Sequence, residues 1–288
     1  MRYVLAVAAL PTVLQAQAGS DIYLARLTGS GAMVRVEAPT TVTERAGYDN
    51  QPSFTPTGLA LLYTSIRADE QADTYRYEIG SRTITRVTHT PESEYSPTVM
   101  PGGTSFSVVR VEADSTQRLW KFRMDGSAPE LVLTDVRPVG YHAWANAYTL
   151  GVFVLGNPAT LHIADTRTGT SRVVVQGIGR SLHRVPGSEQ ISFLHQSGPE
   201  PHYIKTIEPA TGTIRLVAPA LEGNEFYAWL PDGTPIMGVG AKLYAGSAVS
   251  TPWTEIADLS RHGIAGISRL AVSPDGVMLA IVAEDRGN

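Results

Sequence analysis

The stretch LAVSPDGVMLAIV, residues 270–282, leads a Pro-Asp-Gly turn into a short apolar strand. Proline presets the turn backbone, aspartate bonds back to the chain, and glycine accepts the left-handed conformation. A second copy, WLPDGTPIM, occupies residues 229–237. Related turns recur every 40 to 45 residues, at Pro56, Pro101, Asn146, Pro186, Pro231 and Pro274.

This period and the short alternating strands predict an all-β fold. A repeat of this length is typical of propeller blades, because one four-stranded blade buries both faces only when neighbours pack on it. Six copies therefore predict a six-bladed β-propeller of four-stranded antiparallel blades.

A second recurring feature is an apolar–aromatic pair followed by a turn and another strand, which predicts the outer hairpin of each blade. The column residues are Tyr23, Tyr75, Trp120, His162, Tyr203 and Tyr244. The chain begins with such an outer hairpin (about 21–37) and ends with an inner one (about 266–284). We expect these two hairpins to pair and close the ring, which removes exposed sheet edges.

Composition limits the class of protein. The 288 residues contain 27 glycines and 19 prolines, which suits a turn-rich globular chain. Charge is nearly balanced, with 23 Lys and Arg against 27 Asp and Glu, so we expect no nucleic-acid partner. The chain has no cysteine, and therefore no disulfide holds the fold.

The first residues predict export. Arg2 precedes a short apolar run, and Ala16-Gln17-Ala18 provides small residues at a cleavage site, so we expect residues 1–18 to be a signal peptide. A buried first strand is the alternative. The apolar run is shorter than the roughly 20 residues of a membrane span, so we expect a periplasmic or extracellular monomer whose residues 19–288 form the propeller.

The repeat, best preserved at residues 229–236 and 270–282, resembles that of the TolB-like, WD40-like β-propellers with PD40-type repeats. The resemblance covers the whole chain after residue 18. It implies the fold much more specifically than the function, because peptidase gating domains and lyases share this repeat. TolB itself has an additional α/β domain before its propeller, and we expect this sequence to be TolB-like only in its propeller part.

In such a fold, functional groups are expected just before each inner strand, around the mouth of the central channel. That position predicts a ligand- or partner-binding ring for a protein, peptide or saccharide. Its residues are Asp49, Gln51, Glu94, Tyr95, Tyr141, His142, Arg180, His183, Glu225, Tyr227 and Arg269. A solvated funnel with a few hydrogen bonds between blades is the alternative.

Two hypotheses about function follow. The first is a binding module with no catalytic residues, metal or cofactor of its own. The second is a channel-site enzyme, a metal-assisted polysaccharide lyase or a hydrolase, in which His142 and His183 act as ligands or base, with Glu94 and Gln51 nearby. The resemblance supports the second because oligogalacturonate lyases with this repeat bind a metal through histidines and a glutamine. Trp144 and Trp229 share one repeat position and are expected between blades, with a stacking platform as the alternative.

Overall fold

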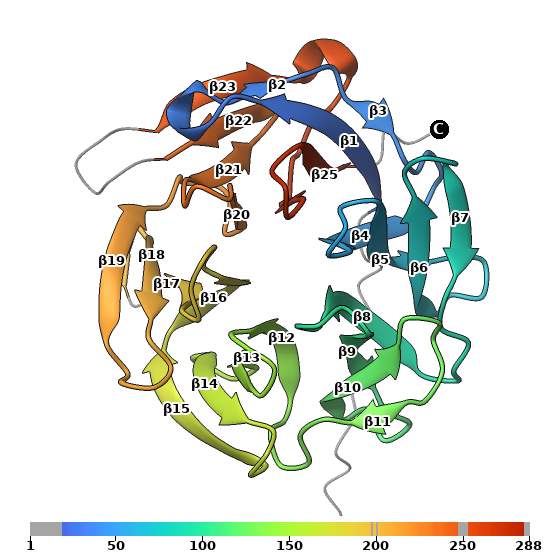
Figure 1. The fold of residues 1–288 in the computed structure, drawn as a ribbon, viewed down its shortest axis with the longest axis vertical. Helices are drawn as coiled ribbons and strands as arrows, with labels where there is room; N and C mark the ends of the chain where they lie inside the picture. Colours follow the sequence, from blue (N-terminus) through green and yellow to red (C-terminus); the bar gives the residue numbers. More distant parts are fainter. Residues whose placement is uncertain (1–18, 197, 200, 247–252, 285–288) are drawn as a thin grey trace, which may run out of the picture.

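The structure is a computed structural model that describes residues 19–196, 198–199, 201–246 and 253–284. The predicted signal peptide, residues 1–18, lies outside the described residues. Antiparallel sheets lie around a common centre, and the chain visits them in order (Figure 1). Within the described ranges, no helix has the length and apolar character needed to cross a membrane.

Five sets of four strands each pair in chain order. The first set contains β4 (Tyr48–Phe54), β5 (Ala60–Ile66), β6 (Ala72–Glu78) and β7 (Thr83–Arg86). The second contains β8 (Ser93–Val99), β9 (Ser105–Val111), β10 (Gln117–Arg123) and β11 (Glu130–Leu131). The third contains β12 (Val139–Trp144), β13 (Thr149–Val154), β14 (Thr160–Asp165) and β15 (Thr170–Gln176). The fourth contains β16 (Ile178–Arg184), β17 (Ile191–His195), β18 (Tyr203–Ile207) and β19 (Ile214–Pro219). The fifth contains β20 (Tyr227–Trp229), β21 (Pro235–Val239), β22 (Lys242–Ala245) and β23 (Thr254–Asp258).

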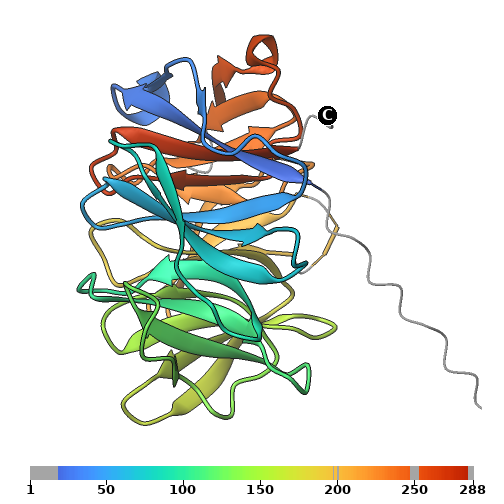
Figure 2. The same cartoon turned by 90° about the vertical axis from the view of Figure 1, so that its right-hand side faces the viewer.

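The remaining set combines both ends of the described chain. Strands β24 (Arg269–Val272) and β25 (Met278–Glu284) are followed in the sheet by β1 (Ser20–Thr28). Strands β1 and β25 are antiparallel from Ser20 opposite Glu284 to Arg26 opposite Met278, and they lie side by side in the edge-on view (Figure 2). The short segments beside them are β2 (Arg35–Val36), β3 (Thr40–Thr41) and the 3-10 helices Gly31–Met33 and Ser260–His262. The predicted pairing of the terminal hairpins is therefore present.

The six predicted turns join the first strand of each set to the second. In each turn, the residue before the landmark donates its backbone N–H to a carbonyl four or five residues on, at 2.8 to 2.9 Å. Where proline is missing, the Asn146 side chain accepts hydrogen bonds from the backbone N–H groups of Tyr148 (3.0 Å) and Thr149 (2.8 Å). The amide thus closes the turn by its own hydrogen bonds.

Burial falls from the inside of each set to the outside. The second strands, such as β5 and β9, are buried on both faces because neighbouring sheets cover both, whereas β7 and β15 are mostly exposed. Strand β1 shows the same packing. Tyr23, Ala25 and Leu27 join one core cluster with Ile236 of β21, and Ile22 and Leu24 join another that includes β5.

Candidate functional site

A central cavity of about 780 Å³ lies among the first strands of the sets. Residues of β4, β8, β12, β16, β20 and β24 all contribute to its wall, and the turn prolines lie along it. This volume falls within the range of small-molecule sites, roughly 300–1,000 Å³.

The structure brings seven of the eleven predicted site residues to this cavity. They are Gln51, Tyr141, His142, Arg180, His183, Tyr227 and Arg269. The other four, Asp49, Glu94, Tyr95 and Glu225, do not line it.

We expected these residues in loops before the innermost strands, but ten of the eleven lie within those strands, and only Glu225 precedes its strand. Simple alternation along the strand does not separate the two groups, because the neighbours Tyr141 and His142 both line the cavity while the neighbours Glu94 and Tyr95 do not. The contacts of each side chain show where it lies.

Asp49 is fully buried and forms an ion pair with Arg45, whose Nη2 lies 2.8 Å from Asp49 Oδ1. The same guanidinium nitrogen donates to Ser65 Oγ at 2.7 Å and to the carbonyl of Ile66 at 2.9 Å. Through Arg45, Asp49 thus connects the loop that precedes β4 with strand β5. Its charge is paired there and not within the cavity.

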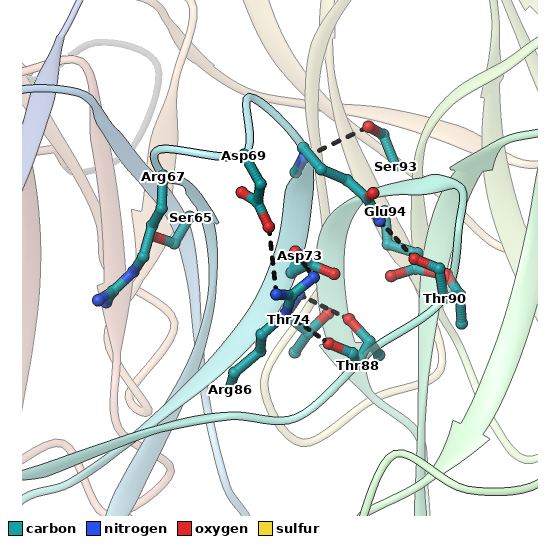
Figure 3. Close-up of polar contacts among 12 residues, drawn as sticks. Ser65, Arg67, Asp69, Asp73, Thr74, Arg86, Thr88, Thr90, Ser93 and Glu94 are labelled. Atoms are coloured by element: carbon teal, nitrogen blue, oxygen red, sulfur yellow. Dashed lines mark hydrogen bonds and ion pairs between the residues drawn. The ribbon is translucent and has the colours of Figure 1, made fainter.

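Glu94 is also fully buried, in a polar cluster where the first set meets the second (Figure 3). It accepts hydrogen bonds from Thr90 and from Arg110 Nη2, the latter at 3.1 Å. Burial raises the pKa of the Glu94 carboxyl, and the hydrogen bonds and the Arg110 charge oppose that rise. Close by, Asp73 forms an ion pair with Arg86 at 2.7 Å, and burial raises its pKa too.

Gln51 links two sheets while lining the cavity. Its side-chain oxygen accepts hydrogen bonds from Thr64 Oγ1 (2.8 Å) and from the backbone N–H of Ser96 on β8 (2.7 Å). Gln51 and Ser96 each stand five residues before a landmark proline, and both have a left-handed backbone, with φ of 59° and 55°. A register shift accompanies each of them, so these are equivalent bulges in the cavity wall.

His142 has a packing role that recurs elsewhere in the molecule. Ser107 Oγ lies 2.6 Å from His142 Nε2 and accepts a hydrogen bond from Trp144 Nε1 at 2.9 Å. The equivalent contact occurs two sets further along the chain, where Ser192 Oγ accepts hydrogen bonds from Tyr227 Oη at 2.9 Å and from Trp229 Nε1 at 2.8 Å. His142 therefore stands where Tyr227 stands, which assigns its Nε2–H as a donor to Ser107. Burial lowers the His142 pKa to about 3, so the ring is neutral near neutral pH.

His183 is not equivalent to His142. It stands three residues before its landmark proline, whereas His142 stands four residues before Asn146, so the two side chains point to opposite faces of their strands. His183 Nε2 lies 3.0 Å from Ser181 Oγ, and its ring packs edge-on against Tyr227 at 4.9 Å. Burial and the charge of Arg269 lower its pKa to about 4.

The two histidines that were predicted as metal ligands or as a base therefore do not occupy equivalent positions on their strands. Glu94, the carboxylate expected beside them, bonds within its own cluster. Among the residues that the structure describes, no group of three or more His, Cys, Asp or Glu side chains is arranged to hold a metal ion.

Arg269 lies at the wall of the cavity on β24. Its guanidinium carbon is 3.9 Å from the ring centroid of Phe226 and 5.1 Å from that of Tyr141. Its Nη2 donates to Tyr141 Oη at 3.3 Å, which connects β24 with β12. Arg180 and Glu225 form an exposed pair, with Nε and Oε1 3.5 Å apart.

Several wall residues escaped the sequence interpretation. Phe226 and Arg184 were not predicted. Phe226 could have been found, because it stands between two predicted residues, Glu225 and Tyr227. Trp144 and Trp229 lie between sheets as expected, since each donates a hydrogen bond to a serine of a neighbouring sheet, and both also line the cavity.

Comparisons with known proteins place the fold. No family model matches the chain, and no curated protein matches its sequence. Among solved structures, a candidate TolB from Agrobacterium tumefaciens superposes with a TM-score of 0.72 at 14% identity, covering 93% of this chain and 99% of the other. TolB from Acinetobacter baumannii gives a TM-score of 0.61 at 13% identity, covering 94% of this chain and 65% of that one. An oligogalacturonate lyase in complex with manganese gives 0.55 at 16% identity, covering 91% and 78%. The chain therefore has the fold of a TolB-like β-propeller.

Proposed function

We propose that this protein is a binding module of the TolB-like propeller class that receives its ligand or partner segment in the central cavity. The proposal includes a six-bladed ring closed by β1 and β25, which the pairing of these strands supports. It also includes export after removal of residues 1–18 and a monomeric state. An exported protein whose mass begins at Gly19 would agree with it, and recovery of the uncleaved chain from the cytosol would oppose it.

One observation favours binding over catalysis. The cavity receives side chains from the first strand of every set, yet its two histidines are engaged in packing contacts. His142 forms the same hydrogen bond to Ser107 that Tyr227 forms to Ser192, and this structural role does not require a basic side chain. A wide cavity that is lined by aromatic residues, and whose polar groups already form hydrogen bonds within the protein, is suited to binding a ligand.

The second candidate is a channel-site enzyme. The fold shared with an oligogalacturonate lyase in complex with manganese supports this candidate, as does the presence of two neutral histidines in the wall. Neutral imidazoles are common ligands of transition metals.

Turnover and capture experiments separate the two candidates. Protein purified with and without added manganese would be assayed on oligogalacturonate, beside His142→Tyr and His183→Phe variants. We expect no turnover that depends on either histidine. Metal-dependent cleavage lost in both variants would replace the binding proposal with the enzyme.

Binding itself is tested by blocking the cavity. Ala271→Trp adds bulk to the cavity wall on β24, and Leu216→Trp places the same side chain on the exposed strand β19 as a control. With both variants shown to be folded, capture of components from an envelope extract should be lost only in Ala271→Trp. Equal capture by both would show that the cavity is not the binding site.

A further inference from the structure

The cavity differs in charge from the rest of the protein. The whole chain has a net charge of −4. The wall of the cavity, in contrast, contains Arg180, Arg184 and Arg269, and no aspartate or glutamate is among the described residues that line it. A cleft lined by one sign of charge attracts ligands of the opposite sign.

Among the described contacts of the three wall arginines, Arg269 is the one whose guanidinium has neither a carboxylate nor a backbone carbonyl partner. Arg180 is paired with Glu225, and Arg184 donates its Nε–H to the carbonyl of Ser188 at 2.6 Å. In the part of the chain that the structure describes, no carboxylate oxygen lies within 4.0 Å of the Arg269 guanidinium.

The surroundings of Arg269 orient it for a ligand. Phe226 covers a face of the guanidinium at 3.9 Å, and Tyr141 Oη takes one of its N–H groups. Stacking on an aromatic ring leaves the N–H edge of the guanidinium exposed, and this edge matches the two oxygens of a carboxylate. Most of the five N–H donors therefore remain available to a ligand.

We propose that Arg269 anchors a carboxylate-bearing ligand in the central cavity, with the rest of that ligand packed against the aromatic side chains of the wall. This inference rests on the proposed binding function and specifies its ligand class. The exposed N–H edge of a single guanidinium can donate to both oxygens of one carboxylate. Phe226 and Tyr141, the half-buried aromatic residues beside Arg269, provide the aromatic surface.

The carboxylate could come from the end of a peptide or from an acidic sugar. Calorimetry would compare N-acetylphenylalanine with its amide, and galacturonate with galactose. Trp144 and Trp229 line the cavity, so their fluorescence reports binding at this place. We expect at least one acid to bind while its neutral counterpart does not, and the pair that behaves so identifies the source of the carboxylate.

Arg269→Gln should lower the affinity for that acid about tenfold or more, because a hydrogen bond to a charged group is lost. The control is Arg215→Gln, which changes an exposed arginine on β19 and should leave affinity unchanged. Equal binding of acid and neutral compound, or an unchanged affinity in Arg269→Gln, would overturn the carboxylate anchor and leave the binding function intact. If no compound binds, the proposed carboxylate contact of Arg269 is also wrong. The binding function is then still tested separately by the Ala271→Trp capture experiment.

Discussion

At the scale of single residues, the equivalence of His142 and Tyr227 explains why a histidine lies buried in the wall of the cavity. Both donate to a serine on the second strand of the preceding set, and a tryptophan two residues later donates to the same oxygen. The ring is only 6% exposed, and its Nδ1 has no hydrogen-bond partner among the described residues. A protonated imidazole would bury an unpaired charge, so the folded protein keeps it neutral.

This burial predicts sensitivity to acid. The pKa of His142 falls to about 3 in the folded protein, while the unfolded chain keeps an ordinary histidine pKa near 6.5. The unfolded state therefore binds the proton first, and stability is lost as pH falls from the unfolded value towards the folded one, by up to roughly 1.4 kcal/mol per pH unit.

His142→Tyr should remove this contribution and keep a hydroxyl donor for Ser107. His142→Gln removes the titrating group with a smaller side chain, in case tyrosine overfills the site. Urea unfolding across the acidic range should show a shallower loss of stability in either variant. His89→Tyr, at an exposed histidine, is the control and should keep the slope of the original protein. Unchanged slopes in both His142 variants would show that this ring does not carry the acid sensitivity.

At the scale of strands, the polar cluster of Figure 3 lies where the first two sheets meet, and its ion pairs join neighbouring strands within each sheet, Arg86 with Asp73 in the first and Arg110 with Glu94 in the second. Arg110 of β9 lies directly across from Glu94 of β8, and its guanidinium carbon is 4.4 Å from the ring centroid of Trp120 on β10. Both members of the pair are buried, so each depends on the other to avoid an uncompensated charge.

Arg110→Leu is therefore expected to cost about 3–5 kcal/mol of unfolding free energy at neutral pH. The pKa of Glu94, already raised by burial, should rise further without the arginine. A raised carboxyl pKa gives stability that is present below the unfolded pKa and lost as pH rises through the folded value. The penalty of the variant should thus shrink in acid.

The matched control is Arg76→Leu, which removes an arginine from the partly exposed Arg76–Glu78 pair on β6. Exposed pairs contribute about 0–1 kcal/mol, so little change is expected. Denaturant unfolding at neutral and at acidic pH measures both variants. Equal penalties for Arg110→Leu and Arg76→Leu, or a penalty independent of pH, would contradict the role given to the buried pair.

The strands also show what sequence could predict. Pro-Asp-Gly turns and period-two alternation are local signals, and they located the first and second strands of each set. The burial of Glu94 was not predictable from sequence. A charged residue near a turn is usually exposed, and only the position of Arg110 on the next strand shows that Glu94 has a buried partner. The position of the Arg269 guanidinium likewise depends on contacts with Phe226 and Tyr141, which lie 43 and 128 residues earlier in the chain.

At the scale of the whole molecule, stability depends on the joining of the two ends of the chain. Strand β1 contributes alternate side chains to two core clusters, one shared with the fifth set and one with the first. Each well-buried aliphatic or aromatic side chain contributes on the order of 1.5–3 kcal/mol. Several such residues on β1 together rival the net stability of a domain, about 5–15 kcal/mol.

Deleting residues 19–38 should therefore unfold or aggregate the entire protein, since it removes β1 and exposes the edges of β25 and β4. Ile22→Ala is a milder version, expected to cost about 2–5 kcal/mol because Ile22 is fully buried between β25 and the first set. Ile84→Ala, on the outer strand β7 where the side chain is 38% exposed, should cost much less. Calorimetry and hydrogen exchange would follow both variants. If the ring is closed through β1, Ile22→Ala lowers protection in sheets on both sides of it in one cooperative transition. If the 19–38 deletion instead melts cooperatively near the temperature of the intact protein, β1 is not what closes the ring, and the cavity must be maintained by the remaining sheets alone.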